Sequence, residues 1–290
     1  MGRWLVRAGL ALLAVLVLLI GYGALIEPRL VLDEERETVE LPGLAAGADP
    51  IEVALLADVQ IGMWWANTGM VERAAQRAVD ADPDVVLLGG DFVYDAGPDV
   101  DPEVATVLDL LDPLLESGIP TYAVLGNHDH ASGAVTELTT ALEGAGVPVL
   151  VNESVPVPGT GTDPLHVVGI GASRPGVADP GQALSGLPAD APRVVLMHNP
   201  SAFPDLPADS APLAVAGHTH CGQIALPGTP EWSYLGLTDE EEVVVDGWAP
   251  EDHGADGNAL FVTCGLGFSV VPVRINAPPQ VVFFELRPPA

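Results

Sequence analysis

Five short apolar segments in this chain each end at a residue that can bind a metal ion or carry a proton. Segments of this length, rich in branched apolar side chains and bounded by turn residues, predict buried strands. In open α/β sheets, ligands bind just beyond the carboxyl ends of such strands. One edge of the predicted sheet therefore collects carboxylates, amides and imidazoles, which together can bind metal ions. The residues at the ends of the five segments are Asp58, Asp91, Asn127-His128-Asp129, His198 and His218-Thr219-His220.

The pattern between these segments indicates an α/β fold. Apolar residues recur on one face of the stretches 68–81, 102–115 and 132–142, which predicts helices between the strands. Alternation of strand and helix implies parallel pairing with right-handed crossovers. In the second half, short apolar runs separated by Pro and Gly predict mostly β structure. We expect the domain to span residues 51–290, after a linker over residues 27–50 that is acidic and then rich in Gly, Ala and Pro.

The acid–base balance of the chain is extreme. Its 290 residues include 40 Asp and Glu against 10 Arg, with no Lys, which gives a net charge of −30. Because phosphate backbones bind basic surfaces, this charge argues against nucleic acid as a partner. The acidic residues are scattered rather than grouped, so they indicate solubility or life in high salt rather than a particular partner.

The amino terminus is long and apolar enough to cross a membrane. The nineteen residues from Ala8 to Ile26 carry no charge, and at helical rise they nearly span a hydrocarbon core of about 30 Å. Arg3 and Arg7 precede this stretch and acidic residues follow it, so the positive-inside rule places the rest of the chain outside the cytoplasm. A cleavable signal peptide is the alternative, although Gly21–Ala24 matches a cleavage site only weakly. We expect a retained anchor over residues 1–26 and a location in the cell membrane.

The two cysteines, Cys221 and Cys264, leave two alternatives open. An exported protein can join them in one disulfide. Otherwise both are unpaired, small apolar side chains. Neither lies in a Cys-x-x-Cys spacing, which argues against a thiolate zinc site.

The spacing of the polar residues suits shared metal ligation. Asp58 and Gln60 are two residues apart, so on an extended segment both side chains face the same ion. His218 and His220 repeat this spacing. Carboxylate and imidazole donors on several strand ends suit divalent ions such as Mn, Fe or Zn.

A pair of ions about 3.5–4 Å apart needs a bridging carboxylate. Asp91 is the natural bridge, because the two glycines before it allow the backbone to turn tightly. Asn127 offers a carbonyl oxygen to the second ion, and His198 stands alone after its strand. The residues therefore predict a site for two metal ions.

These blocks resemble, in residue type and order, those of the calcineurin-like metallophosphoesterase superfamily. The resemblance spans about Ile51 to Leu286, and the segment from Cys264 to Arg274 resembles the membrane-anchored bacterial branch. It implies a two-metal hydrolase with a four-layer α/β/β/α sandwich, here preceded by one N-terminal transmembrane helix. The matching blocks are Asp58-Val59-Gln60, Gly90-Asp91, Gly126-Asn127-His128-Asp129, His198 and Gly217-His218-Thr219-His220.

The resemblance also implies a role for each residue. A bridging hydroxide would attack phosphorus in line. His128 would not bind metal but would face the scissile phosphate, and Asp129 would orient the ring of His128. The implied ligands are Asp58, Gln60, Asp91 and His220 for the first ion, and Asp91, Asn127, His198 and His218 for the second.

Gln60 departs from the histidine that the family usually has at this position. An amide oxygen ligates Mn²⁺ but is a poorer ligand for zinc than imidazole, so manganese is favoured. The resemblance implies hydrolysis of a phosphoester or pyrophosphate bond outside the cytoplasm, in a phosphorylated small molecule or a lipid-linked substrate. Gln60 is the one support for the alternative, a non-catalytic exported module that kept the fold and some metal.

Three further features near these blocks are candidates for substrate contact. Trp64 and Trp65 are expected either to stack on a base or lipid-linked sugar or to pack against the protein. Arg274 is expected either to clamp a phosphate or to be structural. The acidic, aromatic segment 228–248 is expected to form one rim of the substrate cleft.

Overall fold

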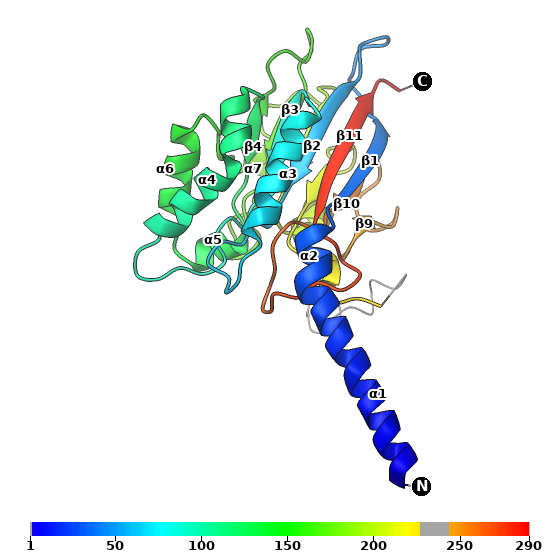
Figure 1. Ribbon diagram of the computed structural model, residues 1–290. Helices are drawn as coiled ribbons and strands as arrows, with labels where there is room; N and C mark the ends of the chain where they lie inside the picture. The colour runs from blue at the N-terminus through cyan, green and yellow to red at the C-terminus, as the bar shows by residue number, and fades with distance from the viewer. Residues whose placement is uncertain (1, 227–243, 290) are drawn as a thin grey trace.

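A computed structural model describes residues 2–226 and 244–289 of the chain (Figure 1). The chain begins with one long helical segment, made of helix α1 (Gly2–Gly21), a π-helical turn (Tyr22–Ile26) and helix α2 (Glu27–Leu30). The stretch Arg3–Leu30 is long and apolar enough to cross a membrane, and its most apolar eighteen residues are almost entirely exposed. It projects from one end of the folded domain.

The first sheet has the strand order β1-β11-β2-β3-β4. Strands β2, β3 and β4 are parallel, β11 is antiparallel to β2, and β1 is parallel to β11. The carboxyl ends of β2, β3 and β4 therefore lie at the end of the sheet where β1 begins. The strands are β1 (Asp33–Glu40), β2 (Ile51–Leu56), β3 (Val85–Leu88), β4 (Thr121–Ala123) and β11 (Gln280–Arg287).

Three helices cover one face of this sheet, at the places where the apolar periodicity predicts them (Figure 1). Helix α3 packs closely because its buried stripe contains the small residues Ala74, Ala75 and Ala78. Helix α4 ends at Gly118, whose positive φ of 76° suits a helix terminus. The helices are α3 (Thr68–Asp80), α4 (Asp101–Ser117) and α6 (Val135–Gly144), and the short α5 (Asn127–Ala131) precedes α6.

The second sheet has the order β5-β6-β7-β8-β10-β9, with β6, β7, β8 and β10 parallel. Its outer face is covered by the short helix α7 (Pro180–Ala183) and a 3₁₀ helix (Pro200–Asp205), so the fourth layer is thin. The strands are β5 (Glu153–Pro156), β6 (His166–Gly169), β7 (Arg193–Leu196), β8 (Ala214–Ala216), β9 (Gly247–Trp248) and β10 (Leu260–Val262).

Side-chain alternation along β2 explains the layers. Val53 and Leu55 pack between the two sheets, whereas Ala54 and Leu56 pack against the helices. A strand buried on both faces is apolar at nearly every position, which is why β2, apart from Glu52, shows no alternation. The fold is therefore the expected four-layer α/β/β/α sandwich, preceded by one N-terminal apolar helix.

The prediction that residues 27–50 form a linker does not hold for the part that forms strand β1. Strand β1 lies within it and pairs along its whole length with β11, and Leu41 and Leu44 are buried between the sheets. The physical reason is that β1 is an edge strand, so most of its charged side chains reach water while its backbone completes the sheet.

Candidate metal centre

The carboxyl ends of the strands bring most of the expected ligands into one buried cluster. Five of these residues have positive φ values, between 51° and 77°, a region that side chains other than glycine rarely adopt. Backbone strain of this kind gathers at functional sites because the surrounding structure holds it in place. The five are Asp58, Gln60, Asp91, His218 and His220.

Asp91 lies at the centre of the cluster. Its Oδ1 accepts a hydrogen bond from the backbone N–H of His128 at 2.8 Å, and its Oδ2 accepts one from Gln60 Nε2 at 3.0 Å. The same Oδ2 lies 3.1 Å from His198 Nε2. Asp91, His198 and His218 each offer a ligand atom, and these atoms all lie within 4.8 Å of one another. Asp91 thus has neighbours on both sides, as a bridging carboxylate requires.

The ring of His198 shows that a cation fits beside Asp91. Its Nδ1 lies 2.8 Å from the carbonyl oxygen of Gly89, which only accepts, so Nδ1 carries the proton of the neutral ring. Nε2 then turns a lone pair towards Asp91 Oδ2, and two such atoms need a proton or a metal ion between them. With no metal, the Asp91 carboxylate outweighs the effect of burial and raises the pKa of His198 to about 9.

Gln60 supplies the second sign that ions fit. Its Oε1 is buried and has no hydrogen-bond partner among the described residues, whereas its Nε2 donates to Asp91. An unpaired buried oxygen costs about 1–3 kcal/mol, and a bound cation removes that cost. Gln60 Oε1, and His198 Nε2 beside the Asp91 carboxylate, are both atoms that divalent ions could take as ligands.

Asp58 is buried next to the His218-Thr219-His220 segment. Both of its carboxylate oxygens are near the backbone N–H of His218, at 3.2 and 3.1 Å, and its Oδ1 lies 3.8 Å from His220 Nε2. Burial raises the pKa of Asp58 to about 7. A Cβ on Gly265 would collide with the Asp58 carboxylate, so the chain needs glycine there, at a φ of 61°.

Arg274 is structural rather than a phosphate clamp. The side chain is fully buried, and it donates to the carbonyl oxygens of Gly267, Ala277 and Cys264 at 2.8–3.0 Å. Its Nη2 also lies 3.2 Å from Nδ1 of His220. Since a guanidinium only donates, Nδ1 of His220 accepts and the ring proton is on Nε2. His220 can therefore bind an ion through Nε2 only after it turns or gives up that proton.

Asn127 and His128 are half-buried, whereas Asp58, Asp91 and His198 are fully buried, and we call this more exposed side of the cluster its mouth. Asn127 Oδ1 accepts a hydrogen bond from Asn199 Nδ2 at 3.0 Å. The ring of His128 stacks on Tyr94 at a centroid distance of 4.3 Å, and its Nδ1 lies 3.2 Å from the Tyr94 carbonyl oxygen. Sequence reasoning missed Tyr94 and Asn199, because nothing in the sequence shows these contacts between distant residues.

Asp129 has a different contact from the one expected. Its carboxylate accepts hydrogen bonds from the backbone N–H groups of Val93 and Gly126, both at 2.8 Å. Asp129 therefore holds together the loops after β3 and β4. The group that contacts the ring of His128, where Asp129 was expected, is the carbonyl of Tyr94. Burial raises the pKa of Asp129 to about 7. The reason is geometric, since Asp129 lies in helix α5 with its side chain directed back into the protein.

The two cysteines form a disulfide, Cys221–Cys264, which decides the alternative left open by the sequence. It joins the loop after His220 to the loop that carries Gly265. Two segments that touch Asp58 are thereby held together by a covalent bond.

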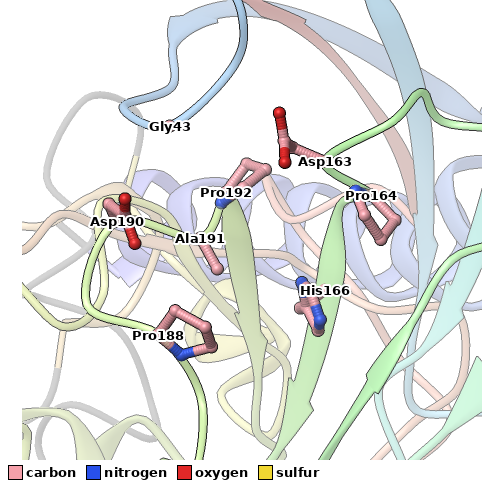
Figure 2. A pocket seen from close by; sticks show the side chains of 8 residues that line it. All are labelled: Gly43, Asp163, Pro164, His166, Pro188, Asp190, Ala191 and Pro192. Carbon is pink, nitrogen blue, oxygen red and sulfur yellow. The ribbon is translucent and has the colours of Figure 1, made fainter.

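A separate cavity of about 430 Å³ lies away from this cluster. Figure 2 shows its lining, which includes His166, Pro188 and Pro192 at the amino ends of β6 and β7. His198 and His220 follow the opposite ends of their strands. Residues 228–243 of the expected cleft rim lie outside the described residues, and Trp248 of that segment packs edge-on against Phe261.

Comparison with known proteins agrees with this fold and cluster. The family model "calcineurin-like phosphoesterase" matches residues 51–222, which include every residue of the cluster described above up to the disulfide. The chain therefore belongs to the calcineurin-like phosphoesterase family.

Two curated relatives and one solved structure show how far the similarity extends. "Phosphodiesterase YaeI" of Escherichia coli is 30% identical over 241 residues, which is 82% of this chain and 83% of that protein. "Transmembrane protein with metallophosphoesterase domain" of Bos taurus is 28% identical over 64% of this chain, but the match spans only 44% of the bovine protein. The crystal structure of TT1561 of Thermus thermophilus has a TM-score of 0.47 at 13% identity, over 75% of this chain and 90% of that one.

Proposed function

We propose that this protein hydrolyses phosphodiester or related phosphoester bonds with two divalent ions, preferably Mn²⁺, held on either side of Asp91. The observation that carries the proposal is the buried Gln60 Oε1, which has no partner among the described residues, beside a His198 Nε2 that faces the Asp91 carboxylate. The Nε2 atom of the same Gln60 amide donates to Asp91 Oδ2 at 3.0 Å, and His198 Nε2 lies 3.1 Å from that oxygen. The similarity to phosphodiesterase YaeI of Escherichia coli supports a phosphodiesterase activity.

The proposed ligands follow the order of the strands. The two positions differ in quality, because the first uses the neutral amide of Gln60 and a His220 ring that Arg274 holds with its proton on Nε2. We therefore expect the second position to bind its ion more tightly. The proposed ligands are Asp58, Gln60, Asp91 and His220 at the first position, and Asp91, Asn127, His198 and His218 at the second.

When bound, the ions would polarise the phosphoryl oxygens and lower the pKa of a water molecule between them. The side chain that would act on the substrate is His128, at the mouth of the cluster. Its Nδ1–H donates to the carbonyl oxygen of Tyr94, which leaves Nε2 free to face the substrate. A second proton, on Nε2, makes the ring a cation that can donate to the leaving oxygen. The ring of Tyr94 stacks on His128 and holds it in this orientation.

The proposed location is the cell membrane, with the domain outside the cytoplasm. Arg3 and Arg7 lie in the first turns of helix α1, before the uncharged stretch that begins at Ala8, and acidic residues follow that stretch, as the positive-inside rule requires. The Cys221–Cys264 disulfide independently suits an oxidising compartment. In this proposal residues 1–26 are the anchor and residues 51–290 carry the phosphoesterase domain.

The test is hydrolysis of methyl p-nitrophenyl phosphate by the full-length protein in detergent, with and without added Mn²⁺. We expect Mn²⁺-dependent release of p-nitrophenol and two ions per chain by elemental analysis. Asp91→Asn should abolish both, whereas the matched control Asp163→Asn, at the separate cavity, should change neither. One ion or none, with no turnover in folded protein, would favour the non-catalytic metal-binding module.

A further inference from the structure

The anchor and the metal cluster lie at the same end of the first sheet. Strand β1 starts directly after α2, and β2, β3 and β4 run antiparallel to β1. Their carboxyl ends, where Asp58 and Asp91 stand, therefore point towards the anchor. In Figure 1, β11 runs away from α1 to the C-terminus at the far end of the domain, in agreement with this pairing.

The anchor is also joined firmly to a loop of the cluster. The carbonyl of Gly23 accepts a hydrogen bond from the backbone N–H of Arg274 at 2.8 Å, and Glu27 Oε1 accepts one from Ala277 at 2.7 Å. Gly23 is packed so closely that a Cβ there would collide with Ile275. Arg274 in turn touches His220. The end of the anchor is thus two contacts away from a proposed metal ligand.

The same loop reaches the mouth of the cluster. The backbone N–H of Val270 donates to the hydroxyl of Tyr94 at 3.3 Å, and Tyr94 stacks on His128. Val270 precedes Arg274 by four residues, so the chain between them spans at most about 15 Å. The point where this loop contacts Tyr94 therefore lies within about 15 Å of the point where the loop contacts the anchor.

Exposed apolar side chains gather on the loops at this end. Among the described residues beyond residue 31, six large hydrophobic side chains are exposed, and four of them lie on loops that contact the anchor or its partner loop. Trp65 stacks on Arg29 of α2, and the carbonyl of Leu226 accepts a hydrogen bond from Asn276. The four, which we call the apolar rim, are Trp64, Trp65, Leu226 and Val270.

We propose that the apolar rim sits in the membrane interface beside the anchor, and that the metal centre takes phosphoesters carried on a lipid chain. The proposal rests on the proposed function. Tryptophan favours the headgroup level of a bilayer, where one part of its ring is apolar and another polar. With a net charge of −30, the protein gains no general attraction to anionic lipids, so apolar contact must hold the rim at the surface.

The position of the metal centre close to the bilayer favours a lipid over a soluble substrate. The phosphate of a membrane lipid lies at the level of the headgroups, where a rim of tryptophans places the mouth of the cluster. A soluble phosphoester has to reach this mouth through the narrow space between domain and bilayer. The rigid connection through Gly23 and Glu27 gives the domain little freedom to turn its site towards the solvent.

The test compares two substrates with the same leaving group, with the full-length protein and Mn²⁺ in phosphatidylcholine nanodiscs. Hexadecyl p-nitrophenyl phosphate resides in the bilayer, and methyl p-nitrophenyl phosphate is soluble. In both, water adds to phosphorus, the bond to the aryl oxygen breaks and p-nitrophenol leaves. We expect kcat/KM to be higher for the hexadecyl ester, and Trp64→Ser to lower that value by about tenfold, the effect of 1.4 kcal/mol.

Trp64→Ser should leave hydrolysis of the methyl ester unchanged, and Val151→Ser, an exposed apolar residue outside the rim, should change neither substrate. A second readout is tryptophan fluorescence. The contribution of Trp64 is the difference between the protein and its Trp64→Phe variant, and lipids brominated near the headgroup should quench it. If Trp64→Ser lowered kcat/KM equally for both esters, or if the lipids did not quench Trp64, the proposal that the apolar rim sits in the membrane interface would be refuted. Turnover of the methyl ester with none of the hexadecyl ester would overturn the lipid substrate and leave the proposed function standing. Failure on both esters would overturn both proposals.

Discussion

Replacing Glu35 with glutamine should stabilise the protein at pH 8 and hardly change its stability at pH 5. Glu35 lies in the edge strand β1 and is half-buried. Burial raises its pKa to about 7, with further repulsion from Glu37, Asp33 and Asp246, and the hydrogen bond from Gln280 opposes this only in part. The folded state thus holds a proton that the unfolded chain releases near pH 4.5.

The sign and size of the effect follow from linkage. Because the pKa is higher in the folded state, stability falls as the pH rises from about 4.5 to about 7. The full difference corresponds to about 3 kcal/mol. Glu35 remains partly in water, and solvent screening reduces the expected gain to about 1 kcal/mol. Glutamine keeps the acceptor for Gln280 and cannot ionise, so the variant escapes this loss.

The measurement is urea unfolding of the full-length protein in detergent, followed by circular dichroism at pH 5 and pH 8. Glu40→Gln removes the same charge from an exposed position of β1 and is the matched control. High salt should reduce the gain of Glu35→Gln, because it screens the neighbouring carboxylates. An equal effect at both pH values, or a loss at pH 8, would mean that Glu35 is solvated as in a linker, and would refute the reasoning.

Three other changes test the site and its support. Gly265→Ala forces a Cβ against the Asp58 carboxylate, so elemental analysis should find at least one ion per chain lost. His128→Ala should keep both ions while kcat falls by about 10²–10⁴, the range for a positioned acid; loss of metal would contradict its role. A chain that begins at Leu41 lacks β1 and should aggregate or melt at lower temperature than one that begins at Glu27, as thermal unfolding would show, whereas equal melting would mean that β1 adds no stability.

The elements that the sequence predicted are those whose side chains are buried in a regular pattern. Strand β2 is apolar at most positions because both of its faces are covered, and helix α3 shows one apolar stripe because one face is covered. Strand β1 has neither signal. Its half-buried positions include the charged Glu35 and Glu37, so no apolar stripe marks it. The strand that it pairs with, β11, lies more than two hundred residues further along the chain.

The cluster shows the same division. The blocks around Asp91 and His218 were found because ligands follow strands at fixed spacings. The contacts of Asp129 and Arg274 were not found, because they depend on loops that meet only in the folded protein. Arg274 in particular lies in a strand-like run of sequence, and its burial beside His220 has no local signal.

The docking of the anchor changes how the protein would meet its substrate. A flexible linker of 24 residues would let the domain wander by about 27 Å from the bilayer, on the scale of 5–6 Å times the square root of its length. The hydrogen bonds of Gly23 and Glu27 remove that freedom. The enzyme would then search in two dimensions, so its rate should depend on the number of substrate molecules per unit area of membrane rather than on their amount in a given volume.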